Sequence, residues 1–389
     1  MPTYSAGTVY HIRLPQFLVQ AERRIDTTLA TKPIGIIASR QPNAPLLTLS
    51  PEAVQEGLTV GMPRSLAAQI SPRTVLLPAH YPVYQKANTA IYEVLSAYCP
   101  VVEPARYGQF YLDMQGMRRM YTSNHQAGYR IVNSITDKVA MRSQVGISTN
   151  KLVSWVTTKV VPDTLYTVEA GTEPNFLSPL DSRHLPVTRQ NAVQTVLHDF
   201  EMPLIRDMQI LSGDLYRSRV IFGDYARTVH HQSRGIDTSA VKSREQRDHI
   251  VERQVLPAPT NDADQIRGMI QLLAVQIGFQ LRQQGRTSKK VVLTIHYTDG
   301  YESNGTSALP RPTDSEITRI LWELCERANT RRNRIRSVTA DVSQFVPRAE
   351  QMALFESRSS RRDHALSGAL DRLRSRYGFD AIRPAVCLV

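Results

Sequence analysis

The order of apolar and polar residues predicts strands that alternate with helices through the first half of the chain. Residues 8–14 alternate as in a half-buried strand, and residues 81–98 repeat apolar side chains at the spacing of an amphipathic helix. Further strands are expected at 34–38, 75–78, 109–113 and 144–148, and further helices at 16–24, 51–56, 65–70, 127–139 and 150–156. Ser50 is expected to cap the helix that begins at Pro51. Such alternation is typical of an α/β or α+β fold.

The second half of the chain shows two further kinds of pattern, one in residues 180–264 and another beyond them. Residues 180–240 form short helical segments and turns, and the polar span 237–264 predicts a linker followed by an edge strand. A new unit of the βαβ type follows, with helices at 266–284 and 314–329 and strands at 290–297 and 335–342. With 389 residues, the chain is expected to hold two to four domains.

Composition narrows the class of protein. Hydrophobic residues make up 41% and charged residues 21%, which is typical of a globular chain. The net charge of +12 and pI near 9.7 favour a polyanionic partner, most commonly nucleic acid. Cys99, Cys325 and Cys387 are far apart, which argues against a disulfide framework or a zinc site. The chain has no long apolar run and no signal-peptide pattern at its start, so we expect a cytoplasmic, nucleoid-associated protein that does not enter a membrane.

Several ordered motifs carry a family resemblance. The most specific is Gly-Ile-Ser-Thr-Asn-Lys-Leu at 146–152; the others are 13–22, 32–36, 52–63, 110–113, 233–237 and 376–382. With these motifs, the chain resembles the Y-family (DinB/UmuC-like) translesion DNA polymerases. The resemblance implies a multidomain α/β (α+β) fold in the arrangement known as the right hand of polymerases. Its expected parts are a palm (1–24 and 79–165), fingers (25–78), a thumb (166–236), a little finger (237–348) and a clamp-binding tail (349–389).

The same resemblance exposes departures at the catalytic positions. Family members hold two Mg²⁺ ions with an aspartate on the first strand and an Asp-Glu pair on a second strand. Here the matching positions are Arg13, Gly108 and Gln109. Other expected functional positions are also changed: Pro51 and Val54 stand in the fingers motif, Leu18 stands at the steric gate, and the palm lysine that the family has near Val161-Pro162 is missing. The resemblance therefore implies a catalytically inactive, ImuB-like member with no catalytic residues, metal ligands or cofactor.

Other carboxylates offer an alternative. Asp113 is four residues beyond Gln109, roughly 13 Å along a strand, whereas paired metal ions sit within about 4 Å of each other. Asp26 and Glu103 are displaced by similar amounts from the positions of the family's carboxylates, and Glu22 falls on the following helix. The competing hypothesis is an active, Mg²⁺-dependent, error-prone polymerase with a rearranged metal site.

Binding motifs remain. Gln351-Met352-Ala353-Leu354-Phe355 resembles the bacterial sliding-clamp motif, in which Gln351, Leu354 and Phe355 would contact the clamp; the alternative is a helix turn docked internally. Basic residues that could contact DNA phosphates are Arg286, Lys289, Lys290, Arg331, Arg332, Arg334 and Arg336. Arg334 and Arg336 would share one strand face. The segment 185–189 lacks the glycines of a helix–hairpin–helix, which puts contact between thumb and DNA in doubt, and His230-His231 are expected on the surface.

Together these features predict a scaffold in translesion synthesis that binds DNA and the sliding clamp. The resemblance implies two further partners, an active error-prone polymerase and a RecA-like accessory protein. A third hypothesis is a structural DNA-binding protein unconnected to replication, which would not bind the clamp.

Overall fold

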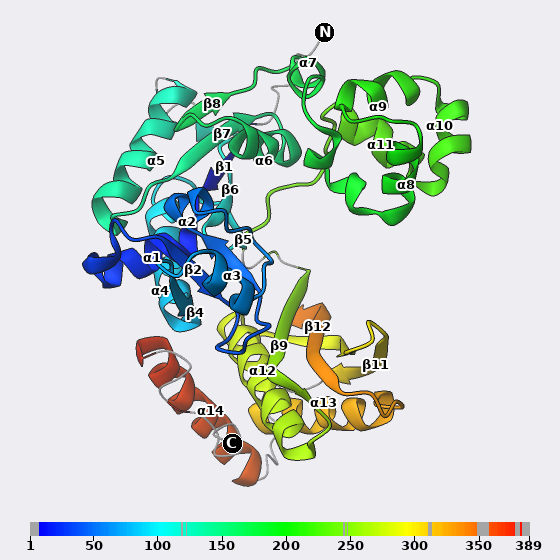
Figure 1. Cartoon of the computed structure of the whole chain (residues 1–389). Helices are drawn as coiled ribbons and strands as arrows, with labels where there is room; N and C mark the ends of the chain where they lie inside the picture. The colour runs from blue at the N-terminus through cyan, green and yellow to red at the C-terminus, as the bar shows by residue number, and fades with distance from the viewer. Residues whose placement is uncertain are drawn as a thin grey trace. The chain divides into compact units, whose positions relative to one another are not determined.

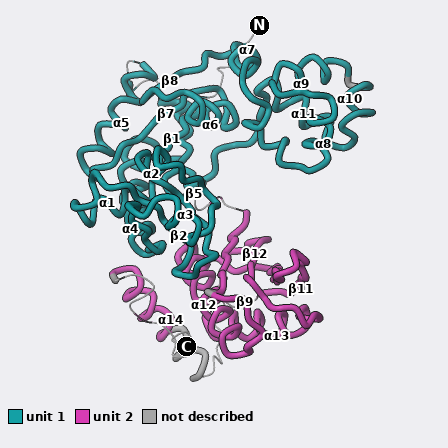
Figure 2. Tube along the Cα trace, in the orientation of Figure 1, with its two compact units in different colours: residues 1–244 teal, residues 245–389 magenta. Residues whose placement is uncertain are grey.

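The computed structural model describes residues 8–117, 120–121, 123–243, 246, 248–309, 313–347, 358–377 and 382. The chain divides into unit 1, residues 1–244, and unit 2, residues 245–389 (Figure 2). No helix within these described ranges has the length and apolar character needed to cross a membrane.

The main sheet of unit 1 has five strands in the order β5-β6-β1-β7-β8 (Figure 1). The strands are β1 (Val9–Arg13), β5 (Val102–Arg106), β6 (Gln109–Asp113), β7 (Gln144–Ser148) and β8 (Leu165–Thr167). All neighbours are antiparallel except β7 and β8. The strands predicted at 8–14, 109–113 and 144–148 are therefore confirmed.

The two faces of this sheet differ. Tyr10 and Ile12 of β1 are buried in a core with side chains of α4 (Tyr81–Ser96) and α5 (Asn124–Val139). On β1 the alternate side chains face α6 (Lys151–Val160), where His11 Nδ1 lies 2.7 Å from Thr158 Oγ1. Because successive side chains on a strand point to opposite faces, Arg13 shares the α6 face with His11.

A smaller sheet has the order β3-β2-β4, with β2 (Ile34–Ile37), β3 (Leu46–Leu49) and β4 (Val75–Pro78). It packs with α1 (Phe17–Ile25), η1 (Thr27–Leu29), α2 (Pro51–Gln55) and α3 (Arg64–Ile70). Ser50 Oγ accepts the N–H of Ala53, as predicted for the helix cap. Strand β3 was not predicted.

Residues 173–233 of unit 1 form short helices joined by turns. They form α7 (Glu173–Leu177), η3 (Ser182–His184), η4 (Pro186–Arg189), α8 (Asn191–Asp199), α9 (Ile205–Leu211), α10 (Leu215–Phe222), η5 (Gly223–Tyr225) and α11 (Ala226–Ser233). Their core continues onto α6 through Leu152, Val153 and Val156. Helix α6 is thus held between the main sheet and the helical part.

Unit 2 contains a four-stranded antiparallel sheet in the order β11-β10-β12-β9. The strands are β9 (His249–Thr260), β10 (Arg286–Tyr297), β11 (Glu302–Leu309) and β12 (Ile335–Pro347), and α12 (Ala263–Gln283) and α13 (Asp314–Ala328) pack on one face around a shared core. The predicted edge strand is confirmed as β9. The prediction of a βαβ-type unit was incomplete, because it lacked β11, which forms a hairpin with β10 before α13 begins.

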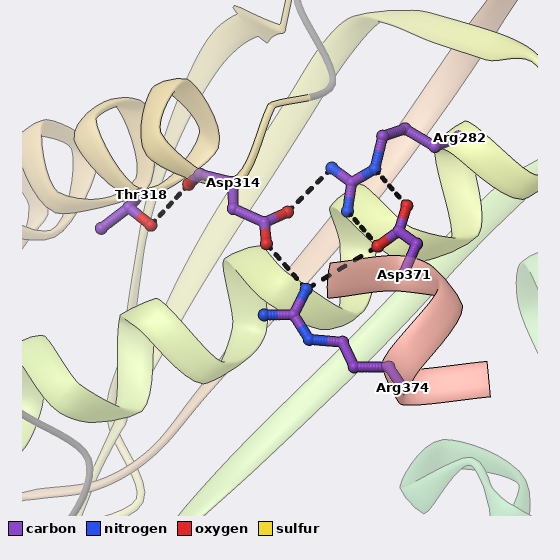
Figure 3. Close-up of polar contacts among 5 residues, drawn as sticks. All are labelled: Arg282, Asp314, Thr318, Asp371 and Arg374. Carbon is purple, nitrogen blue, oxygen red and sulfur yellow. Dashed lines mark hydrogen bonds and ion pairs between the residues drawn. The ribbon is translucent and has the colours of Figure 1, made fainter. Parts of the chain in front are cut away.

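Helix α14 (Arg358–Tyr377) joins unit 2 through a buried ion cluster, which we define as Arg282, Asp314, Asp371 and Arg374 (Figure 3). Arg282 lies 2.7 Å from Asp371 and 2.8 Å from Asp314, and Arg374 lies 2.8 Å from Asp314. The two arginine side chains are only 8% and 3% exposed. Burial alone would lower the pKa of Arg282, but the hydrogen bond to Asp371 and the charge of Asp314 raise it.

Candidate functional site

The segment that would carry the family's Asp-Glu pair is a hairpin, because the predicted strand at 109–113 is preceded by a second strand, β5. Strands β5 and β6 pair antiparallel, with Tyr107 and Gly108 as the turn. Gly108 has a φ of 68°, and a Cβ there would lie 2.6 Å from Phe17 Cβ. Its N–H donates to Asn88 Oδ1 at 2.9 Å, and its carbonyl accepts the N–H of Leu14 at 2.8 Å. The turn is therefore built for glycine, with no space for a carboxylate side chain.

Arg13 occupies the end of β1 directly opposite Gln109 of β6. One guanidinium nitrogen donates to the carbonyl of Thr158 at 2.7 Å. Burial lowers the pKa of Arg13 from its ordinary value. The position of the first-strand aspartate is thus filled by a cationic group anchored to α6.

His11 lies on the same sheet face, against Tyr111, with ring centroids 4.7 Å apart. Burial, followed by the charge of Arg13, lowers the pKa of His11 to about 3. The ring is therefore neutral near pH 7, and Nε2 has no hydrogen-bond partner among the described residues. In the same described ranges, no three His, Cys, Asp or Glu side chains gather in a way that could hold a metal ion.

The alternative carboxylates all have other partners. Glu22 accepts the hydroxyl of Tyr84 at 2.6 Å, and Glu103 pairs with Lys151 at 2.7 Å. Asp26 accepts the N–H and hydroxyl of Thr28, and Asp113 accepts the N–H of Gln115. Asp113 pairs in register with Val9, at the opposite end of β1 from Arg13.

Two of the sequence motifs meet at the start of α6. Asn150 caps the helix by accepting the N–H of Val153, and its amide donates to the carbonyl of Gly235 at 2.7 Å. Asp237 accepts the N–H of Leu152 at 3.0 Å. In the same motif Gly146 permits close packing, because a Cβ there would lie 2.4 Å from the carbonyl oxygen of Ser154. These motifs therefore fix α6 between the sheet and the segment that leaves the helical part.

The predicted DNA-contacting residues fall in two places in unit 2. Arg286, Lys289 and Lys290 lie on β10, and the others lie in the loop before β12 or at its start: Arg331, Arg332, Arg334 and Arg336. Arg331 pairs with Asp299 at 2.9 Å and covers the ring of Tyr301. Arg334 directly precedes β12, and Arg336 lies within it, where the register shifts between Ile335 and Ser337. Both arginines are exposed, whereas Ile335 between them is buried.

The predicted clamp-contacting residues Gln351, Leu354 and Phe355 lie outside the described residues. The two histidines expected on the surface are instead half-buried. His230 Nδ1 lies 2.7 Å from the carbonyl oxygen of Ser212, and His231 lines a cavity beside α6.

That cavity also gathers three arginines that the sequence did not single out, namely Arg106, Arg189 and Arg227. They come from β5, η4 and α11, so their convergence depends on how the helical part packs on α6. No local motif could have indicated it.

Comparisons with known proteins agree on one family. The model of the impB/mucB/samB family matches residues 12–159, and the model of that family's C-terminal domain matches residues 247–354. A protein named DNA polymerase IV from Dehalococcoides mccartyi (strain CBDB1) is 23% identical over 97% of each chain. One from Gluconobacter oxydans (strain 621H) is 25% identical over 79% of this chain and 86% of its own.

Solved structures show the same fold. A Y-family DNA polymerase chimera has a TM-score of 0.68 and 17% identity, covering 87% of this chain and 99% of its own. The insertion ternary complex of Dbh DNA polymerase has a TM-score of 0.64 and 18% identity over the same shares. The predicted multidomain α/β fold class is confirmed.

Proposed function

Because the chain belongs to the impB/mucB/samB family of Y-family polymerases, we propose that it acts in DNA repair as a DNA-binding scaffold for translesion synthesis, without nucleotidyl transfer of its own. The observation that carries this proposal is the composition of the palm site. At this site the Arg13 guanidinium is hydrogen-bonded to the carbonyl of Thr158, and Phe17 packs against the turn at Gly108. The third position holds Gln109.

These residues do not fit the magnesium ions that the family implies. Mg²⁺ prefers carboxylate oxygens in near-octahedral geometry, and a guanidinium repels it. Gln109 offers a single neutral oxygen, and Gly108 offers no side chain. The carboxylates Glu22 and Glu103 would have to leave Tyr84 and Lys151 to serve instead. The described residues around this site therefore supply no ligand set for a two-metal mechanism.

The competing function is an active, error-prone DNA polymerase with a rearranged metal site. It is favoured by the relatives named DNA polymerase IV, of which one from Dehalococcoides mccartyi matches along 97% of both chains. We favour the scaffold because Arg13, Gly108 and Gln109 stand where the family has metal-binding carboxylates. An identity of only 23% to the relative from Dehalococcoides mccartyi is compatible with a change of activity.

We expect the purified protein to add no nucleotide to a primed template with either Mg²⁺ or Mn²⁺. The measurement is primer extension on denaturing gels, with a relative named DNA polymerase IV as the positive control. The variant Glu22→Gln/Glu103→Gln/Asp113→Asn separates intrinsic activity from contamination, because it removes three carboxylates that a rearranged site could use. Template-directed incorporation by the wild-type protein that this variant loses would sink the scaffold proposal.

We further propose that Gln351, Leu354 and Phe355 bind the bacterial sliding clamp. Two apolar side chains beside a glutamine suit a pocket with a polar rim. In this proposal the clamp-bound chain brings an active error-prone polymerase and a RecA-like accessory protein to damaged DNA.

A pull-down with immobilised clamp is expected to retain the wild-type protein and to lose most of the Leu354→Ala/Phe355→Ala variant. Leu366→Ala is a matched control, because Leu366 is an exposed leucine on α14, outside the motif, at 57% exposure. Equal retention of all three proteins would exclude the motif from clamp binding. Absence of wild-type binding would favour a DNA-binding protein unconnected to replication.

A further inference from the structure

Helix α14 carries an apolar stripe that is largely exposed. Leu366, Leu370 and Leu373 are spaced four and three residues apart, so they lie along one side of the helix. Leu366 and Leu373 are 57% and 40% exposed, and Leu370 between them is half-buried. We call these three residues the leucine stripe.

The helix is held to unit 2 by its polar side instead. Ser367, Asp371 and Arg374 each stand one position beyond a leucine of the stripe, which places them about 100° further around the helix. Ser367 and Arg374 are buried, and Figure 3 shows Asp371 and Arg374 pointing towards Arg282 and Asp314. A surface helix usually turns its apolar side to the core. Because α14 is anchored by polar side chains, its leucine stripe stays available to another molecule.

The charge beside the stripe is positive. Helix α14 contains six arginines and two aspartates, and the buried ion cluster uses one of each. Arg372 and Arg376 are exposed, and Arg376 lies beside Leu373, three residues further along the helix. These two arginines are themselves four residues apart, so their like charges repel each other. A carboxylate placed near them would relieve that repulsion.

We propose that the leucine stripe of α14 docks an acidic amphipathic helix of another protein. Leucines spaced four and three residues apart pack against the same pattern on a partner helix, and the charges beside the stripe select the partner. Glutamate or aspartate next to the partner's apolar side chains would face Arg372 and Arg376. Exposed apolar patches with a polar border are typical of protein–protein interfaces.

Other occupants fit this surface less well. Two copies of α14 would bring an excess of arginine against the same excess, and like charges across an interface disfavour pairing. Nucleic acid would attract the arginines but would leave the leucines in water. An acidic helix matches both the apolar and the charged parts of the surface.

The test is fluorescence anisotropy of two labelled synthetic helices titrated with the full-length protein. The peptides have equal length and leucine at the a and d positions of each heptad, but one has glutamate and the other lysine at the flanking e and g positions. The variant Leu366→Gln/Leu373→Gln removes the exposed leucines, and glutamine keeps a high helix propensity. The matched control is Val251→Gln/Val255→Gln, because these valines of β9 are 57% and 59% exposed.

We expect the acidic peptide to bind the wild-type protein and the valine control alike, and to bind the leucine variant roughly tenfold or more weakly. The lysine peptide should bind the wild-type protein more weakly than the acidic peptide does. In Arg372→Glu/Arg376→Glu this preference should be exchanged, so that the lysine peptide binds better. Such a gain of binding cannot come from a loss of folding.

Several results would overturn the proposal. Among them are no binding of the acidic peptide, equal binding of both peptides, and equal losses in the leucine variant and the valine control. A dimer in sedimentation velocity that Leu366→Gln/Leu373→Gln dissociates would also overturn it, because the stripe would then pair two copies. Duplex DNA binding that Arg372→Glu/Arg376→Glu abolishes, without peptide binding, would assign α14 to DNA instead.

The inference goes beyond the proposed function, because it rests on α14 and on neither the palm site nor the clamp motif. Primer extension and clamp retention test the scaffold function without involving the leucine stripe. Failure of the peptide experiment would therefore leave that function standing, and failure of the scaffold function would leave the docking surface in place.

Discussion

Replacing Arg282 with methionine is expected to lower the free energy of unfolding of unit 2 by about 3 kcal/mol or more. Arg282 bridges Asp314 at the start of α13 and Asp371 of α14, and only 8% of its side chain is exposed (Figure 3). Without it, two largely buried aspartates share the single charge of Arg374. Removing one partner of a buried pair is costly because the remaining charge loses its compensation without regaining water.

The matched control for this change is Arg319→Met. Arg319 also contacts two carboxylates, Glu316 and Glu323, but its side chain is 55% exposed. Exposed pairs contribute about 1 kcal/mol or less, since water screens them. The same substitution therefore separates a buried ion cluster from a surface one.

The chain offers a convenient probe for each unit, because it has two tryptophans, Trp155 in unit 1 and Trp322 on α13. In a Trp155→Phe background, urea unfolding followed by fluorescence reports on unit 2. A loss for Arg282→Met no greater than that for Arg319→Met would mean that the buried ion cluster stabilises unit 2 no more than an exposed one does.

The elements that sequence patterns predicted well are those with clear periodicity. Helix α4 and strands β1 and β7 follow the expected spacing, and α13 was placed almost to the residue. Strand β11 was missed for a physical reason. Its inward positions hold Ser303, Gly305 and Ser307, and a Cβ at Gly305 would lie 3.1 Å from Leu324, so small residues replace the apolar alternation.

The hairpin of β5 and β6 was missed because the residues of β5 do not show the usual pattern of a strand. Strand β5 contains Pro104, which only an edge position tolerates well, and it lies at the end of the sheet order. The residues of the candidate site likewise fall into those that the sequence identified and those that it did not. Arg13, Gly108 and Gln109 were identified because a family pattern assigns those positions, whereas Arg189 and Arg227 reach the cavity beside α6 through tertiary packing alone.

Gly108→Ala is expected to lower the free energy of unfolding of unit 1 by about 2 to 5 kcal/mol. A non-glycine residue in the left-handed region costs roughly 1 to 2 kcal/mol, and overpacking typically adds about 1 to 3 kcal/mol. Overpacking applies because the new Cβ would lie 2.6 Å from Phe17 Cβ and 2.7 Å from Cγ, atoms near the backbone that cannot swing away. Fluorescence of Trp155 in a Trp322→Phe background measures the loss.

Gly116→Ala isolates the backbone contribution. Gly116 has a φ of 83°, but nothing lies within 4 Å of a Cβ at that position, so this variant should show only the smaller, conformational loss. If both variants lose the same amount, Phe17 does not pack against the turn. If Gly108→Ala loses more, an aspartate at position 108 would meet the same obstruction. Restoring the family's carboxylates at positions 13, 108 and 109 would then not rebuild a metal site, because the packing of Phe17 excludes one of them.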